Sequence, residues 1–324
     1  MNRRPVLIAL AVALPVAIFI PAKIAASWRP AVVGGGLPFN SVFPPRVTQM
    51  RVASNAVLVD NTETDARPYR FDLATGEVNV SRGEGFTVDG MGQWQWIKSA
   101  PPQIAIGRGG ATESYAVPTE IPVVSPMIVG FYVTPERIEF LSVNRHLRWD
   151  KGARAPKRDV KFAGSFWDNT ALTRDGETMV SVAPTRILRY STRDGHVTGR
   201  TPMANVSPDF RRAAWVSAFG RYGCYELNSR RSSLRRGEVW DAIGGRKLWN
   251  FERQDDAPTA LSLDEKQLAI ANRAERVWHV YDLPTGALLR TLALVPDAQA
   301  GAFSPDGATL YSVAGGKLYR QRAR

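Results

Sequence analysis

The last stretch of the chain, AFSPDGATLYSVAGGKLYRQRAR at residues 302–324, contains three short strand-like segments separated by two turns. Ser, Asp and Gly are typical of tight turns, and the short apolar runs beside them are typical of strands. Three strands alone leave a sheet with an open edge, and proteins usually cover such edges. The stretch therefore predicts a four-stranded sheet that takes its missing strand from elsewhere in the chain.

The Ser-Pro-Asp-Gly turn in this stretch has relatives at four earlier places in the sequence. Aligned on their acid, the five segments share an apolar residue three positions before it, a hydroxyl residue two positions before it and a strand-like run after it. Carboxylate and hydroxyl oxygens accept backbone N–H bonds in such turns, and glycine permits positive φ. We predict structural turns between antiparallel strands at these positions: Glu136, Asp175, Asp209, Asp264, and Asp306 with Gly307.

A second marker sets an aromatic residue and a short polar residue before a glycine-containing reversal, which is typical of a hairpin between a third and a fourth strand. The polar residues stand at positions 72, 150, 191, 241 and 282, so the steps between them are 78, 41, 50 and 41. The step of 78 indicates a hidden, degenerate unit near Ser114 and Tyr115. Residues 46–324 divided into seven units give about 40 residues each, and six units would need about 46.

These segments resemble WD40-type and related bacterial β-propeller repeats over most of residues 46–324. The likeness rests on Trp149-Asp150, Trp240-Asp241, the stretch YDLPTG at 281–286 and SPDG at 304–307. No Gly-His pair opens a repeat, so the buried His-Ser-Trp-Asp network of WD40 proteins is missing. The resemblance implies an all-β propeller of four-stranded antiparallel blades, with seven blades favoured and six as the alternative.

Closure of such a ring predicts where the missing strand comes from. Propellers are commonly fastened by one blade that combines strands from both ends of the chain. We expect residues 31–45, within a Gly- and Pro-rich linker at 29–45, to supply a short strand to the last blade. The predicted organisation is a hydrophobic segment at 1–28, this linker, and the propeller at 46–324.

The N-terminal segment is typical of membrane targeting. Arg3 and Arg4 precede the uncharged run from Pro5 to Ala22, which as a helix would rise about 27 Å, against roughly 30 Å for a hydrocarbon core. Two interpretations stay open: a retained transmembrane helix, or a signal peptide cleaved before Trp28. Both place the propeller on the extracytoplasmic side, either at the inner or plasma membrane or free as a periplasmic or secreted protein.

Catalytic and metal-binding patterns find little support in the sequence. The chain has one cysteine, Cys224, so no intrachain disulfide can form. Its three histidines do not have the spacing of metal ligands. We predict an inert thiol at Cys224 and packed or hydrogen-bonded strand positions for His146 and His279. The glycine-rich AIGRGGA at 105–111 lacks the Lys-Ser/Thr of a phosphate loop and is interpreted as a blade turn. We therefore expect no cofactor and no metal.

Net charge is the main indication of a partner. The formal charge is +12, which favours anionic surfaces. The densest cluster lies in NSRRSSLRRGE at 228–238, interpreted as an insertion between strands, and its candidate partner-binding residues are Arg230, Arg231, Arg235 and Arg236. Behind an export segment the expected partner is a protein, an anionic envelope polymer or a lipid surface rather than nucleic acid. The sequence thus favours a non-catalytic interaction scaffold, with a propeller enzyme (quinoprotein-type dehydrogenase, lactonase or hydrolase) as the alternative.

Overall fold

The structure is a computed structural model. It describes residues 30–34, 47–52, 56–61, 69–80, 85–88, 94–99, 102–108, 111–116, 128–133, 136–142, 144–162, 169–183, 185–202, 211–227, 234–254 and 257–323.

The described strands form seven four-stranded sheets, whose neighbouring strands run antiparallel. Three sheets come first in the chain: β2 (Val47–Val52), β3 (Ala56–Asn61), β4 (Tyr69–Asp72) and β5 (Val78–Val80); β6 (Gly85–Val88), β7 (Trp94–Ser99), β8 (Pro102–Arg108) and β9 (Ala111–Ala116); and β10 (Ile128–Val133), β11 (Arg137–Ser142), β12 (Arg145–Asp150) and β13 (Arg158–Lys161).

Three further sheets follow in the same order of strands. They are β14 (Thr170–Leu172), β15 (Thr178–Ala183), β16 (Arg186–Ser191) and β17 (Val197–Pro202); β18 (Arg211–Val216), β19 (Tyr222–Leu227), β20 (Leu234–Asp241) and β21 (Arg246–Gln254); and β22 (Thr259–Leu261), β23 (Gln267–Asn272), β24 (Val277–Asp282) and β25 (Leu288–Ala293).

The last sheet combines both ends of the described chain. Its order is β26 (Ala300–Phe303), β27 (Thr309–Ala314), β28 (Lys317–Arg322) and β1 (Ala31–Gly34). In the pairing of β1 with β28, Val32 lies opposite Tyr319, and the register shifts between Val32 and Gly34. The fourth strand that the C-terminal stretch lacks is therefore β1.

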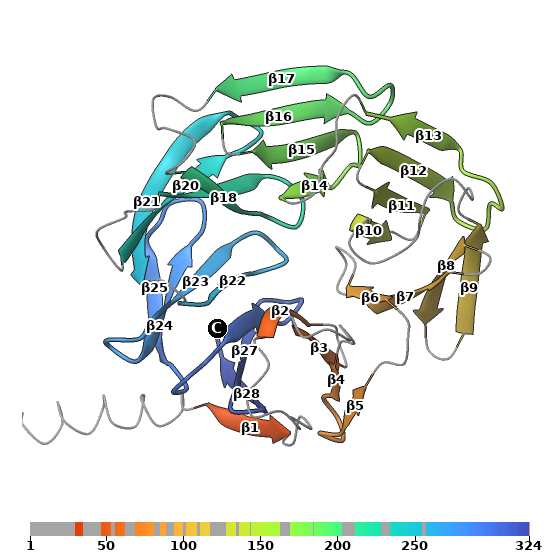
Figure 1. Ribbon diagram of the computed structural model, residues 1–324. Coiled ribbons are helices and arrows are strands. Elements are labelled where there is room, and N and C mark those ends of the chain that lie inside the picture. Colours follow the sequence, from red (N-terminus) through yellow and green to blue (C-terminus); the bar gives the residue numbers. More distant parts are fainter. Residues whose placement is uncertain are drawn as a thin grey trace, which may run out of the picture.

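The sheets are arranged around a common centre, with the first strand of each sheet innermost and the fourth outermost (Figure 1). The ring closes where β26 contacts both β22 of the preceding sheet and β2 of the following one. The chain is thus an all-β propeller of four-stranded antiparallel blades, as the sequence predicted.

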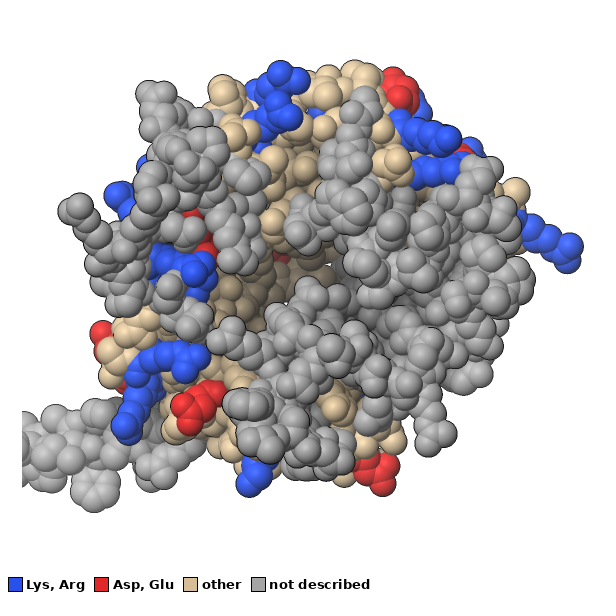
Figure 2. All heavy atoms as spheres, viewed as in Figure 1, with Lys and Arg blue, Asp and Glu red and all other residues tan. Residues whose placement is uncertain are grey.

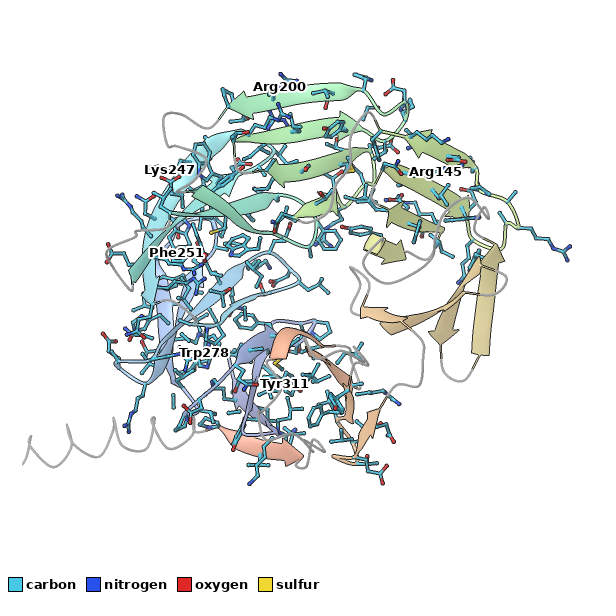
Figure 3. All side chains as sticks on the ribbon, viewed as in Figure 1. Arg145, Arg200, Lys247, Phe251, Trp278 and Tyr311 are labelled. Atoms are coloured by element: carbon cyan, nitrogen blue, oxygen red, sulfur yellow. The ribbon has the colours of Figure 1, made fainter. Side chains whose placement is uncertain are left out.

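The hydrophobic core lies between the blades. Phe162 and Leu141 of one blade pack with Met179 and Leu188 of the next. Trp278 is fully buried among alanines of its own blade and Leu310 of the last one, and the Trp278 and Tyr311 side chains lie among the inner parts of the blades in Figure 3. Alternating small and large residues let sheets that are covered on both faces approach closely.

The predicted acid turns connect the first and second strands of their blades. Thr173 Oγ1 donates to Asp175 at 2.6 Å, and the N–H of Glu177 donates to the same carboxylate oxygen at 3.0 Å. Asp264 and Asp306 accept equivalent bonds, from hydroxyls two positions before and N–H groups two positions after. Gly307 has φ 68°, so its predicted positive φ is confirmed.

The turn prediction is wrong for Asp209. This residue lies outside the described residues, in the connection between β17 and β18, and therefore between two blades. The first-to-second turn of that blade is at residues 217–220, where Ser217 and Gly220 hold the hydroxyl and glycine positions and Phe219 stands where the acid was expected.

The second marker falls on third-to-fourth hairpins, as predicted. The carboxylate of Asp72 accepts the N–H groups of Ala74 and Thr75 at 2.9 and 3.0 Å, and Gly76 donates its N–H to the Asp72 carbonyl. The hidden unit in the 78-residue step is the sheet β6–β9, whose hairpin joins Arg108 and Ala111. Ser114 and Tyr115 lie in its fourth strand, and AIGRGGA is a blade hairpin.

Some hairpin glycines lie close to side chains of the neighbouring blade, so that a larger residue there should reduce stability. A Cβ at Gly286 would lie 2.6 Å from the Trp249 ring of the preceding blade, whereas one at Gly152 would meet nothing within 4 Å; both have positive φ. We expect Gly152→Ala to cost about 1 kcal/mol, from backbone strain alone, and Gly286→Ala clearly more. Chemical denaturation of both variants measures the difference, and equal losses would show that Trp249 moves aside freely.

The predicted N-terminal hydrophobic helix at residues 5–22 lies outside the described residues. Within the described ranges, no helix has the length and apolarity needed to cross a membrane.

Candidate anion-binding face

Strand order gives the propeller two chemically different faces. In a four-stranded antiparallel meander, the first-to-second and third-to-fourth turns emerge at one end, and the second-to-third turns emerge at the other. The first end holds the turn acids of both markers, and we call it the Asp-turn face. The opposite end holds the starts of the third strands, and we call it the arginine face after Arg186, Arg236, Arg276 and Lys317.

The predicted four-arginine cluster is divided in the structure. Arg230 and Arg231 lie outside the described residues, between β19 and β20. Arg235 and Arg236 lie within β20, where they pair in register with Arg253 and Glu252 of β21. The prediction of an insertion loop is therefore wrong for these two residues: the extra length of this repeat includes strand, because β20 and β21 are eight and nine residues long.

Arg235 is part of a buried ion-pair network rather than a free cation. Its Nη1 lies 3.2 Å from Oε2 of Glu226, and Nε of Arg253 lies 2.6 Å from Oε1 of the same carboxylate. The Glu226 side chain is only 5% exposed, so its charge depends on these two guanidiniums. Arg253 also donates to the carbonyls of Gln254 and Ala257.

Neighbouring arginines in β20 should therefore respond differently to mutation. We expect Arg235→Ser to lower the free energy of unfolding by about 1 to 3 kcal/mol, because it strips one partner from a buried carboxylate. Arg236 is exposed, and Arg236→Ser should change stability by less than about 0.5 kcal/mol. Urea denaturation of both variants makes the comparison; similar losses would contradict the assignment of Arg235 to the network.

Exposed cations recur at equivalent places on the arginine face. Arg186 opens β16, Arg236 lies near the start of β20, Arg276 directly precedes β24, and Lys317 opens β28. All four residues are exposed. Among the residues that the structure describes, none of the four has an ion-pair partner within 4.0 Å. Glu252, opposite Arg236, and Glu275, beside Arg276, are nearby acids.

Several cations on the Asp-turn face pair instead with the turn acids. Lys157 lies 2.8 Å from Asp150, and Arg246 lies 3.8 Å from Asp241. Lys266 pairs with Asp264 and Arg193 with Glu177, both at 3.9 Å. The backbone N–H groups of Thr75 and Ala74 hold the pKa of Asp72 below its ordinary value, so this turn carboxylate stays charged at neutral pH.

Turn chemistry thus places acids at the Asp-turn face, where they pair with several of its cations. In the view of Figure 2, described Lys and Arg side chains lie over several blades and do not collect in one place, and Asp and Glu side chains lie among them. Lys247 and Arg200 lie toward the outer part of the ring in Figure 3. The cationic surface is therefore distributed along the ring.

Several buried acids connect neighbouring blades. The Glu139 side chain is 2% exposed, lies 2.6 Å from Nε of Arg137, and packs against Gly176 in the turn of the next blade. Nε2 of His146, which is fully buried, lies 3.7 Å from Oε2 of Glu139. His146 is therefore a packed strand residue, as predicted, and Glu139 is a blade-contact residue that sequence reasoning missed.

Glu265 is the other acid that sequence reasoning missed. It is 9% exposed, has φ 58°, and belongs to the turn between β22 and β23. Its Oε1 accepts the Ser217 hydroxyl at 2.5 Å, the Phe219 N–H at 2.9 Å and the Arg221 N–H at 3.4 Å. Glu265 thus supplies, from the next blade, the carboxylate that the turn at 217–220 lacks.

Cys224 and His279 have surroundings typical of structural residues. Cys224 is buried, and desolvation raises the pKa of its thiol, which opposes thiolate chemistry. His279 lies 3.2 Å from Glu275 and 3.4 Å from the Tyr281 hydroxyl. No group of three or more His, Cys, Asp or Glu residues within the described ranges could hold a metal ion.

Comparison with known proteins shows the fold and no family. No protein-family model matches the chain, and no curated protein matches it in sequence. Among solved structures, 1190 chains match, so the fold alone does not select a function. One of them is the Kuenenia stuttgartiensis hydrazine synthase, which is 12% identical with a TM-score of 0.52 and covers 89% of this chain and 99% of its own.

Proposed function

We propose that the chain is a non-catalytic β-propeller that binds an anionic partner at its arginine face. The observation that supports this function most directly is the separation of charge. Turn acids pair with several cations on the Asp-turn face, whereas Arg186, Arg236, Arg276 and Lys317 on the other face have no ion pair among the described residues. Surfaces of one charge sign raise the local concentration and association rate of oppositely charged partners.

Two variants of equal net charge test this proposal. The face variant replaces Arg186, Arg236, Arg276 and Lys317 by Ser, and the control variant replaces Lys151, Arg193, Arg246 and Lys266, which are exposed on the Asp-turn face. Both lose four positive charges. We expect the face variant to elute from a heparin column at clearly lower salt than the control, because surface charges act only within about 8 Å at physiological ionic strength. Equal elution would show that the overall charge, and not this face, attracts the anion.

The cellular setting belongs to the same proposal. The apolar run at 5–22 supports attachment to the inner or plasma membrane, or export by a cleaved signal, with the propeller outside the cytoplasm. In that setting an anionic envelope polymer, a lipid surface or an acidic protein is the available partner. Protease accessibility of the propeller in intact spheroplasts tests the orientation: protection would contradict it.

A propeller enzyme is the second candidate. The fold likeness to the hydrazine synthase favours it only through the fold, since propellers support both catalysis and binding. A substrate or cofactor found in the central channel by co-crystallisation would favour this alternative over the binding function.

A further inference from the structure

We infer that the partner of the arginine face is an extended polyanion that crosses several blades, rather than a compact anion held at one point. This inference rests on the proposed function and specifies its partner. It follows from where the four exposed cations lie, which is at or near the start of the third strand in four different blades.

The four blades are consecutive around the ring. Contacts join the blade of Arg186 to that of Arg236 through β15 and β18, and the blade of Arg236 to that of Arg276 through β21 and β23. The blade of Arg276 contacts that of Lys317 through β22 and β26. The cations therefore form an arc along one face that spans four blades.

Spacing along this arc prevents one compact anion from contacting all four cations. Sheets that pack face to face lie about 10 Å apart, and propeller blades diverge outward, so cations on neighbouring third strands are separated by at least about that distance. Two neighbouring side chains are long enough to reach one phosphate or sulfate group, but a single group of this size cannot contact all four cations. Salt screens the field of each cation over about 8 Å, so a small anion bound at one cation gains little attraction from the next.

An extended polyanion can contact the four cations in turn. Each contact after the first is intramolecular, so modest individual attractions multiply into a useful affinity without a deep pocket. Exposed single charge contacts are individually weak. The arrangement suits a flexible, regularly charged polymer, such as an acidic polysaccharide, better than a small metabolite.

The test uses the full chain and heparin fragments of increasing length, with inorganic sulfate as the compact probe. We expect the Kd to fall steeply with fragment length until a fragment reaches all four cations, and then to level off. Each single substitution (Arg186→Ser, Arg236→Ser, Arg276→Ser or Lys317→Ser) should weaken the longest fragment by a similar factor, roughly two- to fivefold. Each should also lower the slope of log K against log salt by about one.

Four results would overturn the inference. Affinity that does not depend on fragment length, or a loss caused almost entirely by one substitution, indicates a compact site. A third result is that anionic vesicles bind more tightly than the longest fragment at equal charge concentration, and that the face variant loses this binding. The partner is then a membrane surface: the proposed function holds, and the polymer inference does not. Equal binding by the face and control variants overturns the proposed function itself.

Discussion

Deleting residues 31–34 from the chain should destabilise the propeller by about 3 kcal/mol or more, far beyond the effect of an ordinary surface deletion. The deletion removes β1, so that β28 loses the backbone hydrogen bonds of its outer edge, each worth about 1 kcal/mol. It also uncovers the core cluster of Val313 and Leu318, against which Val33 packs. Thermal and urea unfolding of the full chain and the deletion variant measure the loss.

Two adjacent substitutions separate loss of the strand from loss of chain length. Val33 packs against the core, whereas Val32 is 58% exposed on the other side of the strand. We expect Val33→Asp to reproduce much of the destabilisation and Val32→Asp to have little effect. Unchanged stability in the deletion variant, or equal effects of the two substitutions, would contradict closure of the ring by β1.

Replacing Glu265 by Ala should cost about 3 kcal/mol, because it leaves the Ser217 hydroxyl and two backbone N–H groups of another blade without their acceptor. Buried donors that lose a charged acceptor cost about 1 to 3 kcal/mol each before the site relaxes. The neighbouring Asp264→Ala serves as the control, since Asp264 accepts the Ser262 hydroxyl and the Lys266 N–H of its own turn. We expect it to cost about 1 kcal/mol.

A double-mutant cycle with Ser217→Ala tests whether the two blades are coupled. The residues are 48 positions apart in sequence and directly bonded, so the combined loss should be clearly smaller than the sum of the single losses. Additive losses would show that Glu265 acts within its own turn only. Glu265→Gln, which keeps an oxygen acceptor and removes the charge, should retain part of the stability.

Local chemistry explains which parts of the fold could be predicted from sequence. The turns at Asp175, Asp264 and Asp306 and the hairpin at Asp72 hold themselves together with bonds between residues two or three positions apart. Such patterns are visible in a single sequence. The acid turns connect the first and second strands, and the aromatic-polar-Gly segments connect the third and fourth strands. These repeated connections were enough to predict four-stranded propeller blades.

Contacts between blades were beyond this reasoning. The turn at 217–220 carries Phe219 where an acid was expected, and its carboxylate comes from Glu265, whose partner is set by ring geometry and not by spacing. The role of Arg235 was missed for a similar reason. In sequence it stands in an arginine-rich run, but cross-strand pairing brings it to the buried Glu226.

The sequence predicted the charge sign of a partner but not which residues form the candidate binding face. The net charge of +12 predicted an anionic partner, and the densest run of arginines was chosen as its site. The structure instead spreads exposed cations over several blades at one strand position, as Arg186, Arg276 and Lys317 illustrate. Because Arg186, Arg276 and Lys317 stand 40 or more positions apart in the sequence, they form no local cluster there.

Pairing of β1 with β28 also sets the order in which the protein can be completed during synthesis. Val32 and Tyr319 are 287 positions apart, so at about 5 to 20 residues per second a ribosome needs roughly 15 to 60 s after making β1 before its partner exists. All other blades can form as they emerge, because their four strands are contiguous. A four-residue β1 is too short to form a stable sheet with a wrong partner during that interval, and its shortness therefore protects the nascent chain until the ring can close.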